Sequence, residues 1–244
     1  MASSADAGPR KILALDAAGS ACSAAVWREG AVVARCFEAM ARGQSEHLVP
    51  MVETVMAEAG LTYQALDAIA VTRGPGGFTG VRIGLATARG LALASGRPVI
   101  GLDCFEAVAA GVSEGERAGR GLLVLLDAKR AEVYARLERA GEVGEALCLK
   151  PEVLAARLPR IPLLLAGDAV AQVEPALRAA GHDLRPASAP GHVDAARVAE
   201  LAAARGLPGP DRAPPQPLYL RPPDVTLPRR DPPGVVASKG PRGS

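Results

Sequence analysis

Aromatic residues are scarce in this sequence: Phe, Trp and Tyr make up 3% of its 244 residues. Hydrophobic residues still account for 49% of the chain, so we expect a core built of Ala, Val and Leu. No apolar run reaches the roughly 18 residues of a membrane-spanning helix, and we expect no membrane association. A chain of this length suits one large domain or two lobes.

Cysteine and histidine are rare as well, and the net charge is small. The four cysteines stand far apart without a CxxC pair, which is typical of reduced, buried residues in a cytoplasmic protein. With 28 basic and 26 acidic residues the net charge is +2, which gives the chain no electrostatic reason of its own to bind nucleic acid. The three histidines do not have zinc-binding spacing, so no metal site is expected. Without a GxSxG or Cys–His signature, a nucleophilic hydrolase is disfavoured.

Short apolar runs and helical patterns alternate along the chain in two successive blocks, each opening with a run that ends in an acid. The predicted strands are residues 11–16, 21–27, 31–37, 67–72, 98–102, 121–127, 131–139, 145–149 and 162–166. The predicted helices are residues 45–59, 79–94, 151–158, 169–180 and 193–205. This recurrence predicts an internal duplication.

The same pattern predicts how the chain is divided. Residues 11–109 are expected to form an N-terminal lobe and residues 110–225 a C-terminal lobe. Residues 1–10 are expected to be a disordered leader and residues 226–244 a disordered tail. Within the second lobe, residues 217–221 are expected to lie extended on the body of the protein.

The most distinctive stretch begins as a Gly/Pro turn at residues 74–80 and continues as a helix that is apolar nearly all round. Thr79 is expected to cap this helix, and Gly96 to end it. A helix without a polar face needs cover on more than one side. Gly80 and Gly84, four residues apart, predict a close approach by another backbone. We expect one side of the helix to lie on the chain's own sheet and the other side to meet a second helix, either from this chain or from a partner.

The glycine turn also lies where a phosphate site could lie, between a strand and a helix start. A P-loop has Lys and Ser/Thr after its last glycine, whereas Val81 and Arg82 follow Gly80 here. Asp16 could hold Mg²⁺ for a nucleotide, but its neighbours offer few ligands, and a turn-capping role is favoured. The residues of this alternative nucleotide or phosphate site are Asp16, Gly76, Gly77 and Thr79.

Five segments of the sequence resemble the TsaB family, the dimerisation subunit of the bacterial tRNA threonylcarbamoyladenosine machinery. They are ILALDAAGSACSAAVW at 12–27, SEHLVPMVE at 45–53, RGPGGFTGVRIGLATARGLAL at 73–93, DAKRAEVYA at 127–135 and PLYLR at 217–221. The resemblance implies an α/β, actin-like ASKHA fold of two lobes, each with a mixed β-sheet flanked by helices. It also implies a degenerate paralogue of TsaD, the catalytic subunit of that machinery.

What the resemblance implies about function is a non-catalytic, cytoplasmic scaffold without a cofactor. Such a scaffold takes part in making t6A at position 37 of tRNAs that read codons starting with A. The implied partners are TsaD in a heterodimer, the ATPase TsaE within the larger complex, and a second copy when TsaD is absent. Contact with tRNA is implied only through the complex.

In this family the first two helices pack against those of the partner, and here they correspond to residues 45–59 and 79–94. The residues expected at the interface are His47, Leu48, Met51, Val52, Val55, Val81, Arg82, Gly84, Leu85, Thr87, Ala88 and Leu91.

The sequence also departs from the family pattern. Ala17 and Gly77 stand where the family usually has Thr and Ser, which weakens the case for a nucleotide. Cys104 and Val108 align with two metal-binding histidines of TsaD, and valine cannot ligate a metal. Two alternatives stay open: an actin-like ATPase acting through Asp16 and the glycine turn, and direct tRNA binding by scattered arginines.

Overall fold

The computed structural model describes residues 10–209 and 213–220. The predicted tail and, apart from residue 10, the predicted leader lie outside these residues. The strands are β1 (Lys11–Asp16), β2 (Ala21–Arg28), β3 (Ala31–Ala39), β4 (Ala68–Thr72), β5 (Val99–Leu102), β6 (Gly121–Asp127), β7 (Val133–Arg139), β8 (Glu142–Val143), β9 (Leu147–Leu149), β10 (Leu163–Ala166) and β11 (Leu184–Pro186). The helices are α1 (Gln44–Glu58), α2 (Phe78–Ser95), α3 (Cys104–Ala110), α4 (Glu114–Arg117), α5 (Pro151–Arg157), α6 (Val170–Ala179) and α7 (Ala195–Arg205), with a 3₁₀ turn, η1 (Tyr63–Ala65).

The strands form two sheets with the same topology. The first has the order β3-β2-β1-β4-β5, and the second has the order β8-β7-β6-β10-β11, with β9 also paired to β7. In each sheet an antiparallel meander is followed by parallel strands. The predicted two-lobed α/β fold with mixed sheets is therefore confirmed, and the shared order accords with the predicted duplication.

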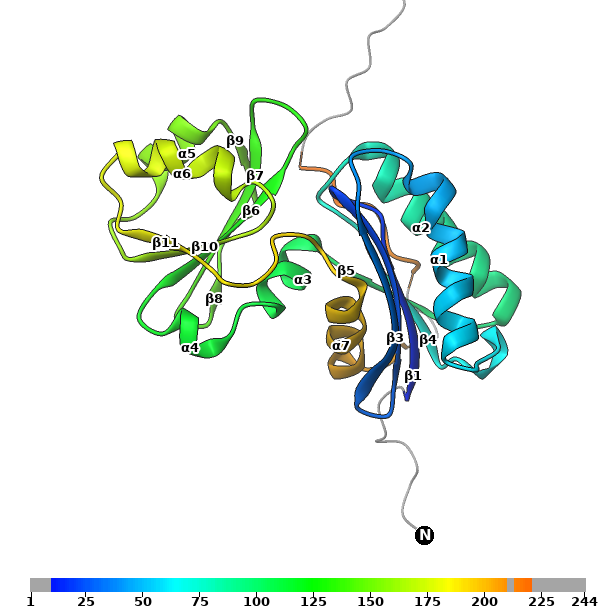
Figure 1. The fold of residues 1–244 in the computed structure, drawn as a ribbon. Coiled ribbons are helices and arrows are strands. Elements are labelled where there is room, and N and C mark those ends of the chain that lie inside the picture. Colours follow the sequence, from blue (N-terminus) through cyan, green and yellow to red (C-terminus); the bar gives the residue numbers. More distant parts are fainter. Residues whose placement is uncertain (1–9, 210–212, 221–244) are drawn as a thin grey trace, which may run out of the picture.

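The helices cover the first sheet on both faces (Figure 1). Helices α1 and α2 lie side by side on its outer face, and α7 packs on the opposite face, between this sheet and the second lobe. Helices α5 and α6 lie together on the outer side of the second sheet. One face of the α1–α2 pair is therefore buried on the sheet, while the other points away from the second lobe.

Strand β6 shows how the sequence pattern divides the core. Leu122, Val124 and Leu126 belong to a cluster that also contains α3, α7 and the first sheet. Leu123 and Leu125 belong to a second cluster with α5 and α6. Because side chains alternate along a strand, the unbroken apolar run of β6 fills both clusters.

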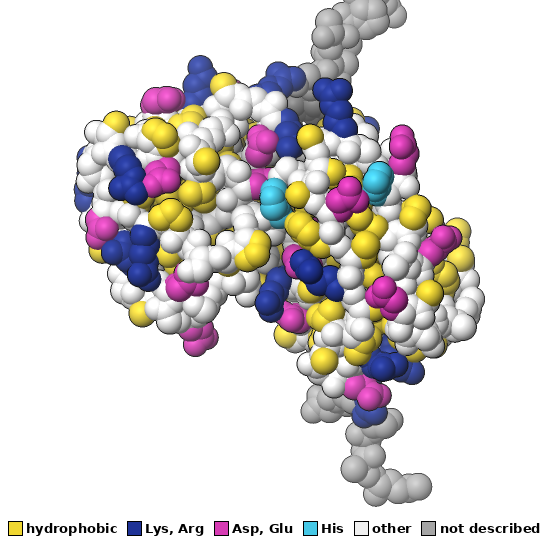
Figure 2. Space-filling view, in the orientation of Figure 1, with side chains coloured by type: hydrophobic (Ala, Val, Ile, Leu, Met, Phe, Trp, Pro, Cys, Tyr) yellow, Lys and Arg dark blue, Asp and Glu magenta, His cyan; other side chains and the backbone are white. Residues whose placement is uncertain are grey.

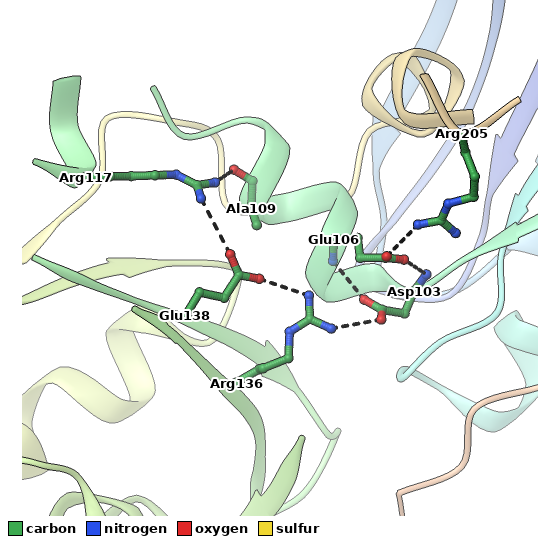
Figure 3. A network of polar contacts seen from close by, with 7 residues as sticks. All are labelled: Asp103, Glu106, Ala109, Arg117, Arg136, Glu138 and Arg205. Carbon is green, nitrogen blue, oxygen red and sulfur yellow. Dashed lines mark hydrogen bonds and ion pairs between the residues drawn. The ribbon is translucent and has the colours of Figure 1, made fainter. Parts of the chain in front are cut away.

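A buried ion-pair network joins the two lobes (Figure 3). Arg136, on β7 of the second lobe, lies 2.8 Å from Asp103 and 3.0 Å from Glu138. Its guanidinium also lies over the ring of Phe105, with 4.8 Å between Cζ and the ring centroid. Arg136 is 7% exposed and Asp103 is 8% exposed, so water screens this pair little.

The network continues along α3. Asp103 caps this helix, since it accepts a hydrogen bond from the backbone N–H of Glu106 at 2.8 Å. Glu106 in turn pairs with Arg205 at the end of α7, 2.6 Å away. On the other side, Arg117 pairs with Glu138 and donates to the carbonyl of Ala109. The start of α3 is thus tied to both lobes.

Several predicted details need correction. Helix α1 runs from Gln44 to Glu58, within a residue of the predicted 45–59, and contains Pro50. Helix α2 begins after Gly77 without a side-chain cap, so the predicted capping by Thr79 is wrong. Gly96 ends α2 with a φ of 69°, as predicted. The prediction missed α3, α4, β8 and β11, which are at most seven residues long and therefore show little periodicity. Among the described residues, no helix is long and apolar enough to cross a membrane.

Candidate functional site

The glycine turn before α2 packs against the chain's own backbone. The N–H of Gly77 donates to the carbonyl oxygen of Ala18 at 2.8 Å. A Cβ atom at Gly76 would overlap the Ala18 carbonyl, and one at Gly80 would overlap the Ala17 carbonyl. The close backbone approach predicted for Gly80 therefore occurs, and the approaching backbone is the β1–β2 turn of this chain.

Gly84 also faces the first sheet and the β1–β2 turn. A Cβ atom there would lie 3.5 Å from a methyl carbon of Val71 and 3.9 Å from the backbone nitrogen of Ala17. Gly80 and Gly84 thus form one groove, as the spacing predicts, and this groove is filled by the first sheet and its turn. It is not open to a partner helix.

Asp16 is completely enclosed at the end of β1. Its Oδ1 accepts hydrogen bonds from the Thr72 hydroxyl and from the Ala18 N–H, while Oδ2 has no partner among the described residues. The bond to Ala18 confirms the predicted turn-capping role. Burial raises the pKa of Asp16 to about 7, with smaller opposing contributions from the Thr72 and Ala18 hydrogen bonds. The nucleotide alternative stays a prediction, which this enclosed geometry does not favour.

Asp16→Asn is expected to remove a pH-dependent loss of stability. The folded chain keeps Asp16 protonated up to about pH 7, whereas an unstructured aspartate titrates near 3.8. The folded state therefore binds more protons between these values, and the free energy of unfolding falls as the pH rises through this window. The total loss is on the order of 4 kcal/mol. Urea unfolding from about pH 4 to pH 8 measures it, and Asp16→Asn should gain stability over wild type as the pH rises.

A second variant checks the direction in which Asp16 changes the stability with pH. The Thr72 hydrogen bond lowers the pKa of Asp16, so Thr72→Val should move the window of lost stability to higher pH. An Asp16→Asn chain with the same pH dependence as wild type would show that this carboxyl group is not the cause.

The predicted interface residues on α1 and α2 fall into two groups. Eight are buried against the chain's own sheet: Leu48, Met51, Val52, Val55, Val81, Gly84, Leu85 and Ala88. His47 and Arg82 are exposed, and Thr87 and Leu91 are partly exposed. The partner interface stays a prediction, and the accessible surface for it lies on the opposite side of the two helices.

That opposite side, here called the outer face, is apolar along α2. Ala86, Gly90 and Ala94 follow at helical spacing and are all exposed, and Leu93 beside them is 88% exposed. On α1, Val49 is 47% exposed. Hydrophobic side chains reach the surface over these helices, at the right of Figure 2. Gly90 costs about 1 kcal/mol against alanine in a helix, and beyond its own helix nothing in the described chain lies within 4 Å of where a Cβ atom would stand.

An aromatic and arginine cluster at the start of α2 was not predicted. Phe78 and Tyr219 stack with 5.5 Å between ring centroids and are 43% and 39% exposed. Arg82 lies over Phe78 at 3.5 Å, and its Nε donates to the Tyr219 hydroxyl at 3.0 Å. The scarcity of aromatics was a usable signal, since two of the few rings meet at this surface. Residues 213–220, here called the strap, therefore run beside α2, and the predicted extended segment on the body is confirmed over its described part.

Sequence reasoning also missed a polar cluster between the lobes. Ser20 donates to Asp168, which follows β10, and lies 3.1 Å from Nδ1 of His192. Asp168 also accepts from the N–H of Asp127 at 2.9 Å. No spacing in the sequence links these residues, because they come from three separate loops and the end of β6. The cluster ties the β1–β2 turn to the second lobe.

Cys104 and Val108, which the resemblance matches to two metal-binding histidines of TsaD, lie in the core. Cys104 and Val108 are one helical turn apart on α3, and they are 1% and 3% exposed. Within the described part of the chain, no group of three or more His, Cys, Asp or Glu side chains could hold a metal ion. The side chains around α3 serve packing and the ion-pair network described above.

Two sheets of the same doubled topology, with helices α1 and α2 on the outside of the first, define an actin-like protein of the ASKHA class. A family model described as TsaD, tRNA N6-adenosine threonylcarbamoyltransferase, matches residues 38–175. The tRNA threonylcarbamoyladenosine biosynthesis protein TsaB of Escherichia coli is 39% identical over 158 residues, which cover 62% of this chain and 67% of that protein. The chain belongs to the TsaB family.

Two further comparisons place it within this group. The solved structure of YeaZ from Pseudomonas aeruginosa superposes with a TM-score of 0.67 at 32% identity, covering 86% of this chain and 100% of that one. A tRNA N6-adenosine threonylcarbamoyltransferase from Erythrobacter litoralis is 35% identical over 152 residues, which cover 57% of this chain and 44% of that enzyme. The chain is thus a member of the threonylcarbamoyladenosine biosynthesis system that is also related in sequence to its transferase.

Proposed function

We propose that this chain is the non-catalytic scaffold subunit that supports the transferase TsaD in making t6A at position 37 of tRNAs that read codons starting with A. It binds TsaD through the outer face of α1 and α2. The observation that supports this proposal most is the exposed apolar row on α2, where Leu93 is 88% exposed and a Cβ atom at Gly90 would meet nothing else in the described chain within 4 Å. Small residues in such a row allow another helix to approach closely.

The paralogous transferase is the proposed partner because it shares the relevant part of the fold. The TsaD family model spans residues 38–175, which include both α1 and α2. Two paralogues that present the same pair of helices can pair through them with approximate two-fold symmetry. TsaE is proposed to join this pair within the larger complex, tRNA to be contacted only through the complex, and the cytoplasm to be its location.

The absence of catalysis is proposed from the interior of the first lobe. Asp16 is fully enclosed, and the glycine turn is packed on the Ala17–Ala18 backbone, so neither offers an open side to a substrate. Cys104 and Val108, at the positions of the metal-binding histidines of TsaD, are in the core.

The double variant Val49→Glu/Leu93→Glu is expected to weaken binding of TsaD by at least about tenfold, a loss of about 1.4 kcal/mol. Both side chains are exposed in this chain, so the fold should survive while two charges enter an apolar contact. Val153→Glu is the matched control, because Val153 on α5 is exposed to the same 47% as Val49 but lies on the second lobe. Titration calorimetry with TsaD from the same organism measures the change.

Unchanged affinity of the double variant, with wild-type melting, would exclude the outer face as the TsaD site. Equal weakening by Val153→Glu would point to an interface elsewhere. A substitution at Gly84 is unsuitable for this test, because a larger side chain there would press on Val71 in the core.

A further inference from the structure

A pocket of about 320 Å³ lies at the edge of the first sheet. One wall is β5, which is the last strand in the order of that sheet. Residues 205–208 at the end of α7 and residues 213–216 of the strap form the other walls, and the side chains of Arg73 and Glu106 complete the lining. None of the lining residues belongs to α1 or α2, so this pocket is separate from the outer face.

The free edge of β5 presents backbone groups to this pocket. The carbonyl oxygens of Pro98 and Leu102 accept hydrogen bonds from the β4 side, at 3.0 and 2.8 Å. Because the backbone groups of successive strand residues point to opposite edges, those of Gly101 point away from β4. Its carbonyl oxygen accepts a hydrogen bond from Nη1 of Arg205 at 3.2 Å. Its N–H points to the same edge and has no hydrogen-bond partner among the described residues.

The charges around the pocket do not balance. Glu106 is the only acidic residue among the described lining residues, and it already pairs with Arg205, 2.6 Å away (Figure 3). Arg73 is half-buried, and within the described part of the chain its guanidinium has neither an ion pair nor a hydrogen bond. The pocket therefore carries one uncompensated positive charge.

The glycine at position 101 brings this charge and the free N–H together. A Cβ atom there would lie 3.6 Å from Cδ of Arg73 and 2.5 Å from Cβ of Pro215 in the strap. Any larger residue would therefore push the strap off the edge of β5. With glycine, the arginine side chain passes directly beside the Gly101 backbone.

We propose that this pocket binds a small molecule through an oxyanion group, either a carboxylate or a phosphate ester, with the Arg73 guanidinium and the Gly101 N–H as donors. A guanidinium presents parallel N–H groups that match two oxygens of such an anion. The walls partly exclude water, so the pairing is screened less than it would be at an open surface. Leu207 and Pro215 offer apolar contact to the rest of the molecule. The proposal does not depend on the scaffold function, because no residue that carries it belongs to α1 or α2.

Titration of the full chain with simple anions tests this site. Inorganic phosphate and acetate are the two probes, and chloride at matched ionic strength is the control for screening. At least one probe should shift the NMR signal of the Gly101 amide in a saturable way. A shift with phosphate alone identifies a phosphate ester as the ligand class, and a shift with acetate identifies a carboxylate.

The Arg73→Met variant should bind the same probe at least about tenfold more weakly, because the charged donor is lost. Arg42→Met is the matched control, since Arg42 is exposed and lies outside the pocket, and it should bind as the wild type does. Should Arg73→Met melt early, Arg73→Gln takes its place, because it keeps more of the polar stem while it removes the charge, and the same results decide it.

Three results would overturn the proposal. The first is a Gly101 amide that neither probe shifts saturably. The second is an equal shift with chloride, which would indicate screening alone. The third is wild-type affinity in the Arg73 variant, which would place the bound anion elsewhere.

Discussion

Gly80→Ala is expected to prevent the first lobe from folding, at a cost above about 4 kcal/mol. The added Cβ would overlap the carbonyl oxygen of Ala17, and both atoms belong to rigid, buried backbone. The turn and the helix have little room to move aside, because Gly76 packs on the Ala18 carbonyl in the same way and the Gly77 N–H is hydrogen-bonded to that carbonyl. Urea unfolding, or the yield of soluble chain if the variant does not fold, measures the effect.

Gly90→Ala is the matched control on the same helix. Nothing in the described chain lies within 4 Å of a Cβ there, so alanine should stabilise the isolated chain by about 0.5–1 kcal/mol through helix propensity. A Gly80→Ala chain as stable as wild type would mean that the β1–β2 turn does not press on α2. Destabilisation by Gly90→Ala would mean that some part of the chain covers the outer face.

Arg136→Met is expected to destabilise the chain by about 3–5 kcal/mol, because it leaves the carboxylates of Asp103 and Glu138 without their buried partner. The methionine fills much of the volume of the arginine stem, so the cost reflects charge rather than a large cavity. Arg197→Met is the control, since Arg197 pairs with Glu200 at the surface of α7, and its loss should cost less than about 1 kcal/mol. Denaturant unfolding at neutral pH compares the two.

A double variant identifies the cause of this loss. Asn at position 103 can still accept the capping hydrogen bond from Glu106 while it removes the charge that Arg136 neutralises. Arg136→Met/Asp103→Asn should therefore be less destabilised than the sum of the two single variants. Strict additivity would show that the ion pair does not couple the lobes.

Much of the fold was predictable because it depends on local pattern. The acid-ended runs of β1 and β6 were predicted with correct ends, since four to six consecutive apolar residues bounded by a polar one indicate a buried strand. Gly96 was recognised as a helix end, because only glycine adopts its left-handed conformation without strain. In contrast, the buried ion pair at the start of α3 and the aromatic and arginine cluster at the start of α2 escaped prediction, since they depend on Asp103 meeting Arg136 and on Tyr219 meeting Arg82.

By itself, the sequence determined the order of the longer strands and helices, the repeat of one strand pattern in two lobes, and the presence of an apolar helix with closely packed glycines. Periodicity and backbone preferences are properties of neighbouring residues, so these features needed no knowledge of distant contacts. Only the tertiary structure decided which side of that helix is buried. Gly80 and Gly84 face Ala17 and Val71, while Gly90 and Leu93 lie on the outside. The sequence could not distinguish these two sides, because the helix is apolar nearly all round.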